Sequence, residues 1–290
     1  MKNISCITSV SSIDEIWLGS EYYSEICRLK KNKDRIEFLG TLKLSDFVEN
    51  PGFPRFFYED SKHNLWVVTT KKILVKPADE KQLQDTNFPL MDITGIKEGK
   101  DGTLWISTRK QGVYNVIVSP GLTFEEKKIR NLTAQTDGLI NDNIGAICVD
   151  DSGLVWMGSQ EGDVFTYDPQ TKKVENLSNM FDMLEEGIYN IIMDQLGHIW
   201  ISTNKRVVEY DPKNGGIMDY STMGDVTVNS FMPNSYFKSS SGKILYGGNR
   251  GISVFTPYEH LSDEPRRIKT MVADVKIDGT SSLLEKNNQR

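Results

Sequence analysis

Residues 150–159 read Asp-Asp-Ser-Gly-Leu-Val-Trp-Met-Gly-Ser and form the clearest copy of a motif that recurs along the chain. They are followed by residues 164–169, which read Val-Phe-Thr-Tyr-Asp-Pro. A second copy covers residues 194–203 and is followed by residues 207–212, which also end in Tyr-Asp-Pro. A self-similar unit of this size indicates an array of small, similar structural units.

The repeat occurs six times when its tryptophan is used to align the copies. Successive copies of this position lie 39 to 51 residues apart, close to the roughly 40–50 residues of one propeller blade. The sequence therefore predicts an all-β fold, a β-propeller of four-stranded blades with six repeat units. The aligned position is occupied by Trp17, Trp66, Trp105, Trp156, Trp200 and Leu245.

The fourth unit shows how each repeat divides into strands. Residues 144–149 form a short apolar run that predicts the first strand, and residues 150–153 have the composition of a turn. Residues 154–157 are apolar throughout, which predicts a second strand covered on both faces. Residues 164–167 and 173–177 predict the third and fourth strands. Because each blade is flanked by two neighbours, we interpret the tryptophans as packing residues between blades.

The overall composition is that of a globular protein. The chain has 290 residues, 38% of them hydrophobic, and a formal net charge of −6, which disfavours nucleic-acid binding through a basic surface. No run approaches the ~18 apolar residues of a membrane span, and the N-terminal segment lacks the apolar core of a signal peptide. Cys148 lies in an apolar strand and is interpreted as a buried thiol, whereas a contact between Cys6 and Cys27 stays open.

The composition changes near the C-terminus. The chain turns polar from Glu259 to Arg267. Residues 268–277 then predict a new strand, and an Asp-Gly turn follows it. We assign residues 1–261 to the propeller and residues 262–290 to a linker and the first strand of a further, truncated domain.

The motifs of units four and five resemble those of the two-component regulator propeller family. A unit of that family has an Asp-x-x-Gly turn, a Trp-Ile-Gly-Thr-like strand and a Tyr-Asp-Pro-like strand end, and residues 137–144 and 246–257 are similar to its lead-in and last blade. The resemblance implies a seven-bladed ring, of which six units are visible here; a six-bladed ring is the alternative. It also implies that residues 268–278 begin an immunoglobulin-like domain with three tyrosines.

Proteins of this family form the periplasmic sensor region of hybrid two-component system histidine kinases. The resemblance implies a non-catalytic module that recognises a glycan fragment and relays the signal to a histidine kinase downstream of this sequence. It implies an oligosaccharide ligand and a homodimer formed through the full-length receptor. Nucleic-acid partners and membrane contact by this segment are not expected.

An enzyme is the main alternative, because propeller lyases have similar repeats. A hydrolase or lyase needs a base close to an acid or a metal, and the three histidines, His63, His198 and His260, are spread along the chain. The acidic turn residues do not follow the Asp-x-Asp-x-Asp-Gly pattern of a calcium loop. We therefore expect no catalytic residue, metal or cofactor, while a propeller lyase, a glycosidase and a protein-binding scaffold stay open as alternatives.

Basic residues gather in the turns between the second and third strands. In a blade of four antiparallel strands these turns share a face with the connections between blades, and ligands of propellers usually bind at loops around the channel mouth. We expect this face to attract an anionic ligand, such as an oligosaccharide with uronate or sulfate groups. The alternative is that exposed turns carry lysine and arginine for solubility. The candidate ligand-binding residues are Lys72, Arg109, Lys110, Lys205, Arg206 and Arg250.

Overall fold

The computed structural model describes residues 4–32, 35–89, 92–184, 186–222, 230–249, 251–257, 276–277 and 280–281. The chain divides into two compact units, Met1–Phe255 and Thr256–Arg290. The first unit contains all six repeats.

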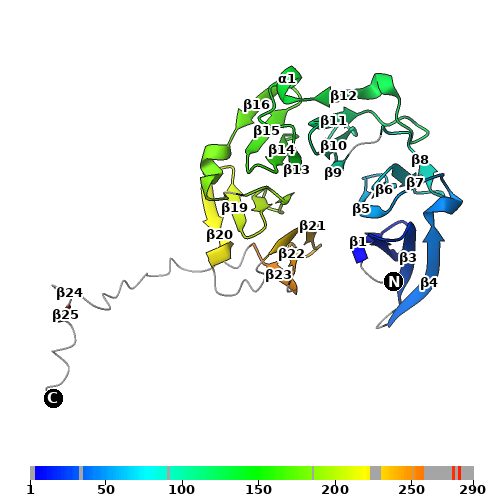
Figure 1. Ribbon diagram of the computed structural model, residues 1–290, viewed down its shortest axis with the longest axis horizontal. Coiled ribbons are helices and arrows are strands. Elements are labelled where there is room, and N and C mark those ends of the chain that lie inside the picture. The colour runs from blue at the N-terminus through cyan, green and yellow to red at the C-terminus, as the bar shows by residue number, and fades with distance from the viewer. Residues whose placement is uncertain are drawn as a thin grey trace, which may run out of the picture. The chain divides into compact units, whose positions relative to one another are not determined.

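Six antiparallel sheets follow one another along the first unit, and neighbouring strands within each sheet are consecutive in sequence. Figure 1 shows the sheets arranged around a common centre, with the first strand of each sheet innermost. Blades 1 to 3 comprise β1 (Ile4–Val10), β2 (Glu15–Ser20), β3 (Glu25–Asn32) and β4 (Arg35–Lys43); β5 (Pro54–Glu59), β6 (Leu65–Thr69), β7 (Ile73–Lys76) and β8 (Gln84–Asp85); and β9 (Ile93–Glu98), β10 (Leu104–Thr108), β11 (Val113–Val116) and β12 (Ile129–Leu132).

Blades 4 to 6 continue the same order. They comprise β13 (Ile144–Val149), β14 (Val155–Ser159), β15 (Val164–Asp168) and β16 (Lys173–Asn176); β17 (Asn190–Met193), β18 (Ile199–Ser202), β19 (Val207–Asp211) and β20 (Gly216–Asp219); and β21 (Phe231–Lys238), β22 (Ile244–Gly248) and β23 (Gly251–Phe255). The predicted all-β propeller is thereby confirmed. Among the described residues, blade 6 has three strands and every other blade has four.

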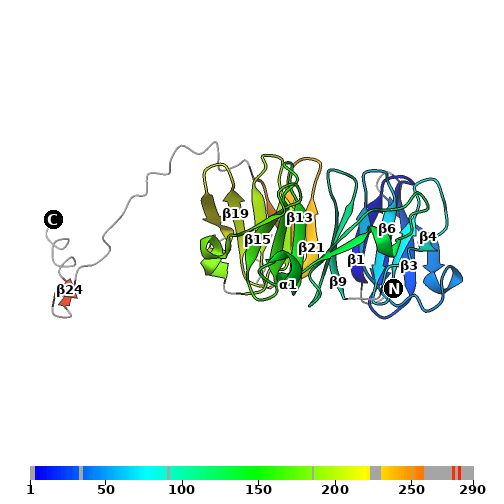
Figure 2. The same cartoon turned by 90° about the horizontal axis from the view of Figure 1, so that it is seen from above.

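Helical segments are short and lie in the connections between strands. They are α1 (Ala134–Asp137), η1 (Leu44–Asp46), η2 (Glu126–Lys128), η3 (Ser178–Leu184) and η4 (Tyr220–Thr222). Seen from the side, the strands run between two opposite faces of the first unit (Figure 2). One face carries the turns that join the first strand of each blade to the second, and the other carries the turns that join the second strand to the third.

In blades 2, 4 and 5 an aspartate before the second strand closes a turn and also binds the tryptophan. Asp150 Oδ1 accepts hydrogen bonds from the backbone N–H groups of Ser152 and Leu154, at 2.8 and 3.0 Å, and Asp150 Oδ2 accepts one from the Trp156 indole at 2.9 Å. The predicted turn is therefore confirmed, and the bond to the indole is an additional finding. The same indole bond joins Asp60 to Trp66 in blade 2 and Asp194 to Trp200 in blade 5.

The tryptophans fill the spaces between blades, as the sequence predicts. Five hydrophobic clusters each combine residues of two consecutive blades, from blades 1 and 2 to blades 5 and 6. In each cluster the tryptophan of one blade faces the next blade along the chain. Trp17, Trp66, Trp105, Trp156 and Trp200 are at most 4% exposed.

The outer faces of the first and last blades are apolar and exposed. Among the described residues, no hydrophobic cluster joins blade 6 to blade 1. Leu245 occupies the tryptophan position of blade 6, and its cross-strand partners Phe237 and Val254 are 60% and 53% exposed. On blade 1, Ile7 and Phe38 lie on the face opposite the tryptophan and are 66% and 62% exposed. Two uncovered apolar faces therefore border the interval between blade 6 and blade 1 (Figure 1).

Blade 2 is complete although its motif departs most from the repeat. His63 stands where the other copies have glycine, and its φ of 63° places it in the left-handed region that glycine favours. Its ring nitrogen Nδ1 lies 3.1 Å from Glu59 Oε1 and 3.0 Å from Ser11 Oγ. These contacts hold a non-glycine residue in this turn.

The second unit is described at residues 256–257, 276–277 and 280–281 only. β24 (Lys276–Ile277) pairs antiparallel with β25 (Thr280–Ser281). The predicted immunoglobulin-like strand overlaps β24 but otherwise lies outside the described residues, as do His260 and Arg250. In the parts of the chain that the structure describes, no helix is long and apolar enough to span a membrane. Cys6, Cys27 and Cys148 are all free thiols.

Candidate functional site

Most of the predicted ligand-binding residues are paired with carboxylates. They lie in or next to the turns between second and third strands, as expected. Lys72 pairs with Asp85, Arg109 with Asp92 at 3.6 Å, Lys205 with Glu186 at 2.5 Å and Arg206 with Asp219 at 2.6 Å. Lys110 forms no ion pair with the described residues. Much of the positive charge of this face is thus balanced locally, and a role in ligand binding stays a prediction.

A pocket of about 300 Å³ lies at the opposite end of the inner strands. Its walls come from the last residues of β5, β9, β13, β17 and β21, so five of the six blades contribute. The volume is at the lower end of the range for small-molecule sites. This hub pocket is lined by Tyr58, Lys97, Glu98, Cys148, Val149, Ile191, Ile192, Met193 and Lys238.

The register of the sheets explains which residues reach the hub pocket. Tyr58, Lys97, Cys148 and Ile192 each lie eight residues before the tryptophan of their own blade. Each is the direct cross-strand partner of that tryptophan, so the four occupy equivalent positions around the channel. Lys97 is the one charged residue of this set.

Lys97 is held by two tyrosines from other blades. Its Nζ lies 2.8 Å from the hydroxyl of Tyr236 in blade 6, and 5.2 and 5.6 Å from the ring centroids of Tyr236 and Tyr58. The backbone N–H of Glu98 donates to the Tyr58 hydroxyl at 2.9 Å, which fixes that ring beside β9. Ring faces attract a cation at such distances, so Lys97 links blades 2, 3 and 6 through its charge.

The charge on Lys97 persists at neutral pH. Burial works against it, but Tyr236, Cys148 and Tyr58 and the hydrogen bond to Tyr236 outweigh burial, and the pKa of Lys97 lies above its ordinary value. Burial raises the pKa of the Cys148 thiol, while Lys97 and Lys238 act in the opposite direction. The net effect keeps Cys148 protonated, which makes it a poor nucleophile.

The described partners of the two lysines in the hub pocket are a hydroxyl group and a carbonyl oxygen. No ion pair joins Lys97 or Lys238 to a described acidic residue, and Lys238 Nζ donates to the carbonyl oxygen of Met193 at 2.9 Å. Glu98 also lines the pocket, but its carboxylate accepts hydrogen bonds from the backbone N–H and hydroxyl of Ser61 at 2.7 and 2.9 Å. The pocket therefore combines two ammonium groups with one carboxylate already engaged elsewhere.

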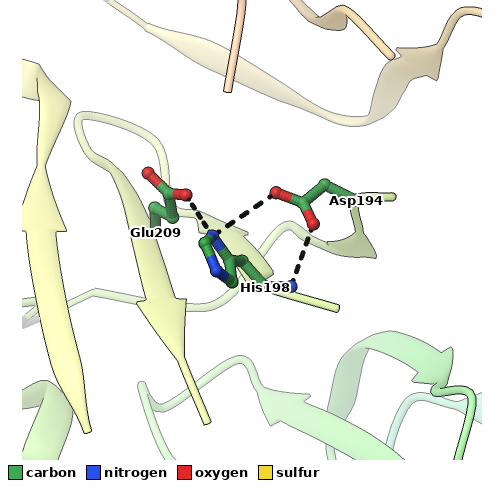
Figure 3. A group of neighbouring side chains, drawn as sticks. All are labelled: Asp194, His198 and Glu209. Carbon is green, nitrogen blue, oxygen red and sulfur yellow. Dashed lines mark hydrogen bonds and ion pairs between the residues drawn. The ribbon is translucent and has the colours of Figure 1, made fainter. Parts of the chain in front are cut away.

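A cluster of three polar side chains lies within blade 5, apart from the hub pocket. Figure 3 shows His198 between Asp194 and Glu209, with its Nδ1 2.6 Å from Glu209 Oε1 and 3.7 Å from Asp194 Oδ2. Sequence patterns did not indicate this grouping, nor the contact of His63 with Glu59. Donor atoms of the three residues lie within 4.8 Å of one another, and one histidine with two carboxylates is a set that a divalent metal accepts.

The hydrogen bonds of this group indicate a structural role. Asp194 accepts hydrogen bonds from the Trp200 indole and from two backbone N–H groups of its turn. Glu209 Oε2 accepts a hydrogen bond from the Tyr220 hydroxyl at 2.6 Å, and burial, followed by this bond, raises the pKa of Tyr220. A metal would have to displace these bonds. We interpret the group as a polar link between the β17–β18 turn, strand β19 and η4 of blade 5.

A family model for the two-component regulator propeller matches residues 87–110 and 138–161. Both segments cover the first two strands of a blade, β9 and β10 in one case and β13 and β14 in the other. The chain carries two-component regulator propeller repeats. The resemblance drawn from the motifs is confirmed for the repeats, while the immunoglobulin-like domain is not shown.

Solved structures with the same fold include two sensor ectodomains. The chain is similar to the extracellular domain of the hybrid two-component system BT3049 from B. thetaiotaomicron (TM-score 0.70, 18% identity, 88% of this chain and 33% of that chain). It is also similar to the extracellular domain of the hybrid two-component system BT4673 from the same organism (TM-score 0.64, 19% identity, 87% and 35%). The chain thus spans about a third of the length of these ectodomains.

An enzyme with the same fold is also similar to the chain. A streptogramin B lyase aligns with a TM-score of 0.62 at 15% identity, over 88% of this chain and 80% of the lyase. At these identities the structural likenesses establish the fold alone. No curated protein sequence matches the chain.

Proposed function

We propose that this chain is a ligand-sensing propeller module of a hybrid two-component system, located in the periplasm and without catalytic activity of its own. The observation that carries the proposal is the presence of two-component regulator repeats within a propeller that aligns with sensor ectodomains over 88% of the chain. A glycan fragment is the ligand, and the signal passes to a histidine kinase downstream. Homodimerisation belongs to the full-length receptor.

A ligand of this module acts by changing the populations of alternative arrangements of the receptor's domains. If it binds one arrangement of the receptor's domains more tightly than another, it favours that arrangement by the difference in affinity. Two surfaces are available for the ligand. One is the face of basic turns, whose ion pairs a strongly anionic ligand would have to replace, and the other is the hub pocket.

A lyase is the second candidate, because a propeller lyase has the same fold and His198 lies beside two acids. Two observations favour sensing over this alternative. The side chains of His198, Asp194 and Glu209 are only 15%, 0% and 12% exposed, and none of the three lines the hub pocket. The carboxylates of Asp194 and Glu209 also accept hydrogen bonds from Trp200 and Tyr220.

A thermal-shift screen across acidic and neutral oligosaccharides tests the proposal. We expect at least one oligosaccharide to raise the melting temperature in a concentration-dependent way, since a ligand at about 100 times its Kd stabilises the fold by ~2.7 kcal/mol. Unsaturated products or new reducing ends in the same mixtures would favour the lyase.

A triple variant tests the basic turns as the ligand-binding face. We expect Arg109→Ala, Arg206→Ala, Arg250→Ala to bind an acidic oligosaccharide more weakly than the wild type. Unchanged affinity removes that face as the site.

A further inference from the structure

The two groups of basic residues in the first unit differ in how their charge is balanced. Four of the residues in or next to the turns between second and third strands have a carboxylate partner within 4 Å, namely Lys72, Arg109, Lys205 and Arg206. The two lysines of the hub pocket have no such partner among the described residues. An ammonium group without a counter-ion at a partly enclosed site attracts an anion, because screening by water is reduced there.

The positions of the two lysines suit an anion that enters the pocket. Lys97 reaches in from β9 and is fixed by the Tyr236 hydroxyl and the ring of Tyr58. Its ammonium group has three N–H donors, of which Tyr236 takes one. Lys238 stands at the end of β21 and keeps an exposed side chain. Both lysines line the pocket together with Cys148, so both charges face the same cavity.

We propose that the hub pocket binds a small organic anion through its carboxylate, with Lys97 and Lys238 as the cationic contacts. Strand β17 also contributes the apolar residues Ile191, Ile192 and Met193 to the lining, and an apolar surface suits the carbon face of a sugar ring. A volume of about 300 Å³ accommodates one such ring rather than an extended chain. The ligand is therefore the terminal uronate of an acidic oligosaccharide, or a free small carboxylate. The inference deepens the proposed sensing function and rests on it.

Isothermal titration of the 290-residue protein with sodium D-glucuronate, D-glucose and sodium acetate tests this site. We expect saturable binding of glucuronate, with glucose at least about tenfold weaker because it lacks the carboxylate. Lys97→Gln and Lys238→Gln should each weaken glucuronate binding about tenfold or more. Lys173→Gln is the matched control, since it removes an exposed lysine of the outer strand β16, and it should leave the affinity unchanged.

The outcomes separate the two sources of the carboxylate. If glucuronate binds at least about tenfold tighter than acetate, the site recognises an acidic sugar; equal affinities assign it to a free carboxylate. Lys97→Gln removes a contact between three blades, so its melting curve is recorded alongside. Lys238→Gln changes an exposed side chain and keeps the test valid if the first variant unfolds.

Three results would overturn the proposal. They are the absence of glucuronate binding up to about 10 mM, equal binding of glucose and glucuronate, and glucuronate binding that Lys238→Gln leaves unchanged. The proposed function is judged separately, through the oligosaccharide screen. If an oligosaccharide binds the wild-type protein and both lysine variants alike, sensing stands and the hub site falls.

Discussion

A single aspartate in three of the blades orders both a turn and a tryptophan. In blade 4, one oxygen of Asp150 accepts backbone N–H groups of the turn and the other accepts the Trp156 indole. The turn therefore fixes the ring that fills the next interface between blades. A charged acceptor makes these bonds stronger than neutral ones, which accounts for an acidic residue at this place in the repeat.

Replacing this aspartate should destabilise the fold by a measurable amount. We expect Asp150→Asn to lower the free energy of unfolding by about 1–3 kcal/mol, because an amide cannot accept every one of these bonds and leaves a buried donor without its partner. Asp151→Asn is the control, since Asp151 is exposed and its change should stay within ~0.5 kcal/mol. Urea unfolding measures both. Equal stability of the two variants would contradict the assigned role.

In blade 1 a glutamate, rather than an aspartate, accepts the hydrogen bond from the tryptophan indole. Glu15 Oε2 accepts the Trp17 indole at 2.9 Å, and Arg28 donates to both carboxylate oxygens at 2.7 and 2.5 Å. The hydrogen bonds from Arg28 are the largest cause that lowers the pKa of Glu15 below its ordinary value of 4.5, while burial acts against them.

The lowered pKa of Glu15 predicts a pH dependence of stability. The folded protein holds the proton of Glu15 less tightly than the unfolded chain, so this group stabilises the fold above pH 4.5 and loses its contribution as the pH falls below that value. We expect Glu15→Gln to cost about 1–2 kcal/mol at pH 7 and to flatten the loss of stability below pH 4.5. Urea titrations at several pH values test this. Parallel profiles for the variant and the wild type would exclude the effect.

The packing residues were predictable from the sequence, whereas the hub pocket was not. The tryptophans stand out because one residue type recurs at a fixed period. Lys97 belongs to no motif and is noticeable only after the repeats are aligned, when a lysine appears where other blades have Tyr58, Cys148 or Ile192. Its contact with Tyr236 joins residues 139 positions apart, and no local pattern reports such a contact.

At the scale of the element, the same strand position has a different environment in the first five blades and in the sixth. Trp200 is fully buried because blade 6 covers its face of blade 5. Leu245 occupies the equivalent position of blade 6, but its neighbours Phe237 and Val254 are exposed. The contribution of this repeat position to stability therefore depends on whether a neighbouring blade covers it.

Truncating the two residues should show this difference. We expect Trp200→Ala to destabilise the protein by about 3–5 kcal/mol, the usual cost of removing a large buried side chain. Leu245→Ala should cost less than about 1.5 kcal/mol, because the cavity it leaves is open to solvent. Thermal unfolding of both variants provides the measurement. A similar cost for both would mean that the Leu245 face is covered.

Strand boundaries were predictable to within a few residues because turn chemistry and apolar runs alternate in each unit. The strands predicted at residues 144–149 and 164–167 correspond to β13 and β15. The charge balance of the turns was not predictable, because the partners of Lys72 and Arg206 lie in the fourth strand of the same blade, 13 residues away in sequence. The composition gives the number of charged residues but does not show which of them form ion pairs.

At the scale of the whole first unit, the apolar faces of blades 1 and 6 are exposed to solvent. Ile7 and Phe38 on one side and Phe237 and Val254 on the other are each more than half exposed. In every other blade the corresponding faces are packed against a neighbour. Exposed apolar faces of this kind promote association.

We therefore expect the isolated chain to self-associate at high concentration. Phe237→Asp should weaken this association, because it places a charge in the centre of the exposed face of blade 6, and should change the melting temperature little. Tyr22→Asp is the control, since Tyr22 is equally exposed in a turn between β2 and β3. Light scattering over a concentration series tests the prediction. A monomer at every concentration, without binding of a hydrophobic dye, would contradict it.

The central claim is that this propeller binds a ligand without transforming it. The most direct measurement is a titration calorimetry series with an acidic and neutral oligosaccharide panel, in which each ligand is recovered afterwards and analysed by chromatography and mass spectrometry. We expect saturable binding of at least one oligosaccharide, which is recovered intact. Conversion of the ligand to shorter or unsaturated products, or no binding across the whole panel, would contradict it.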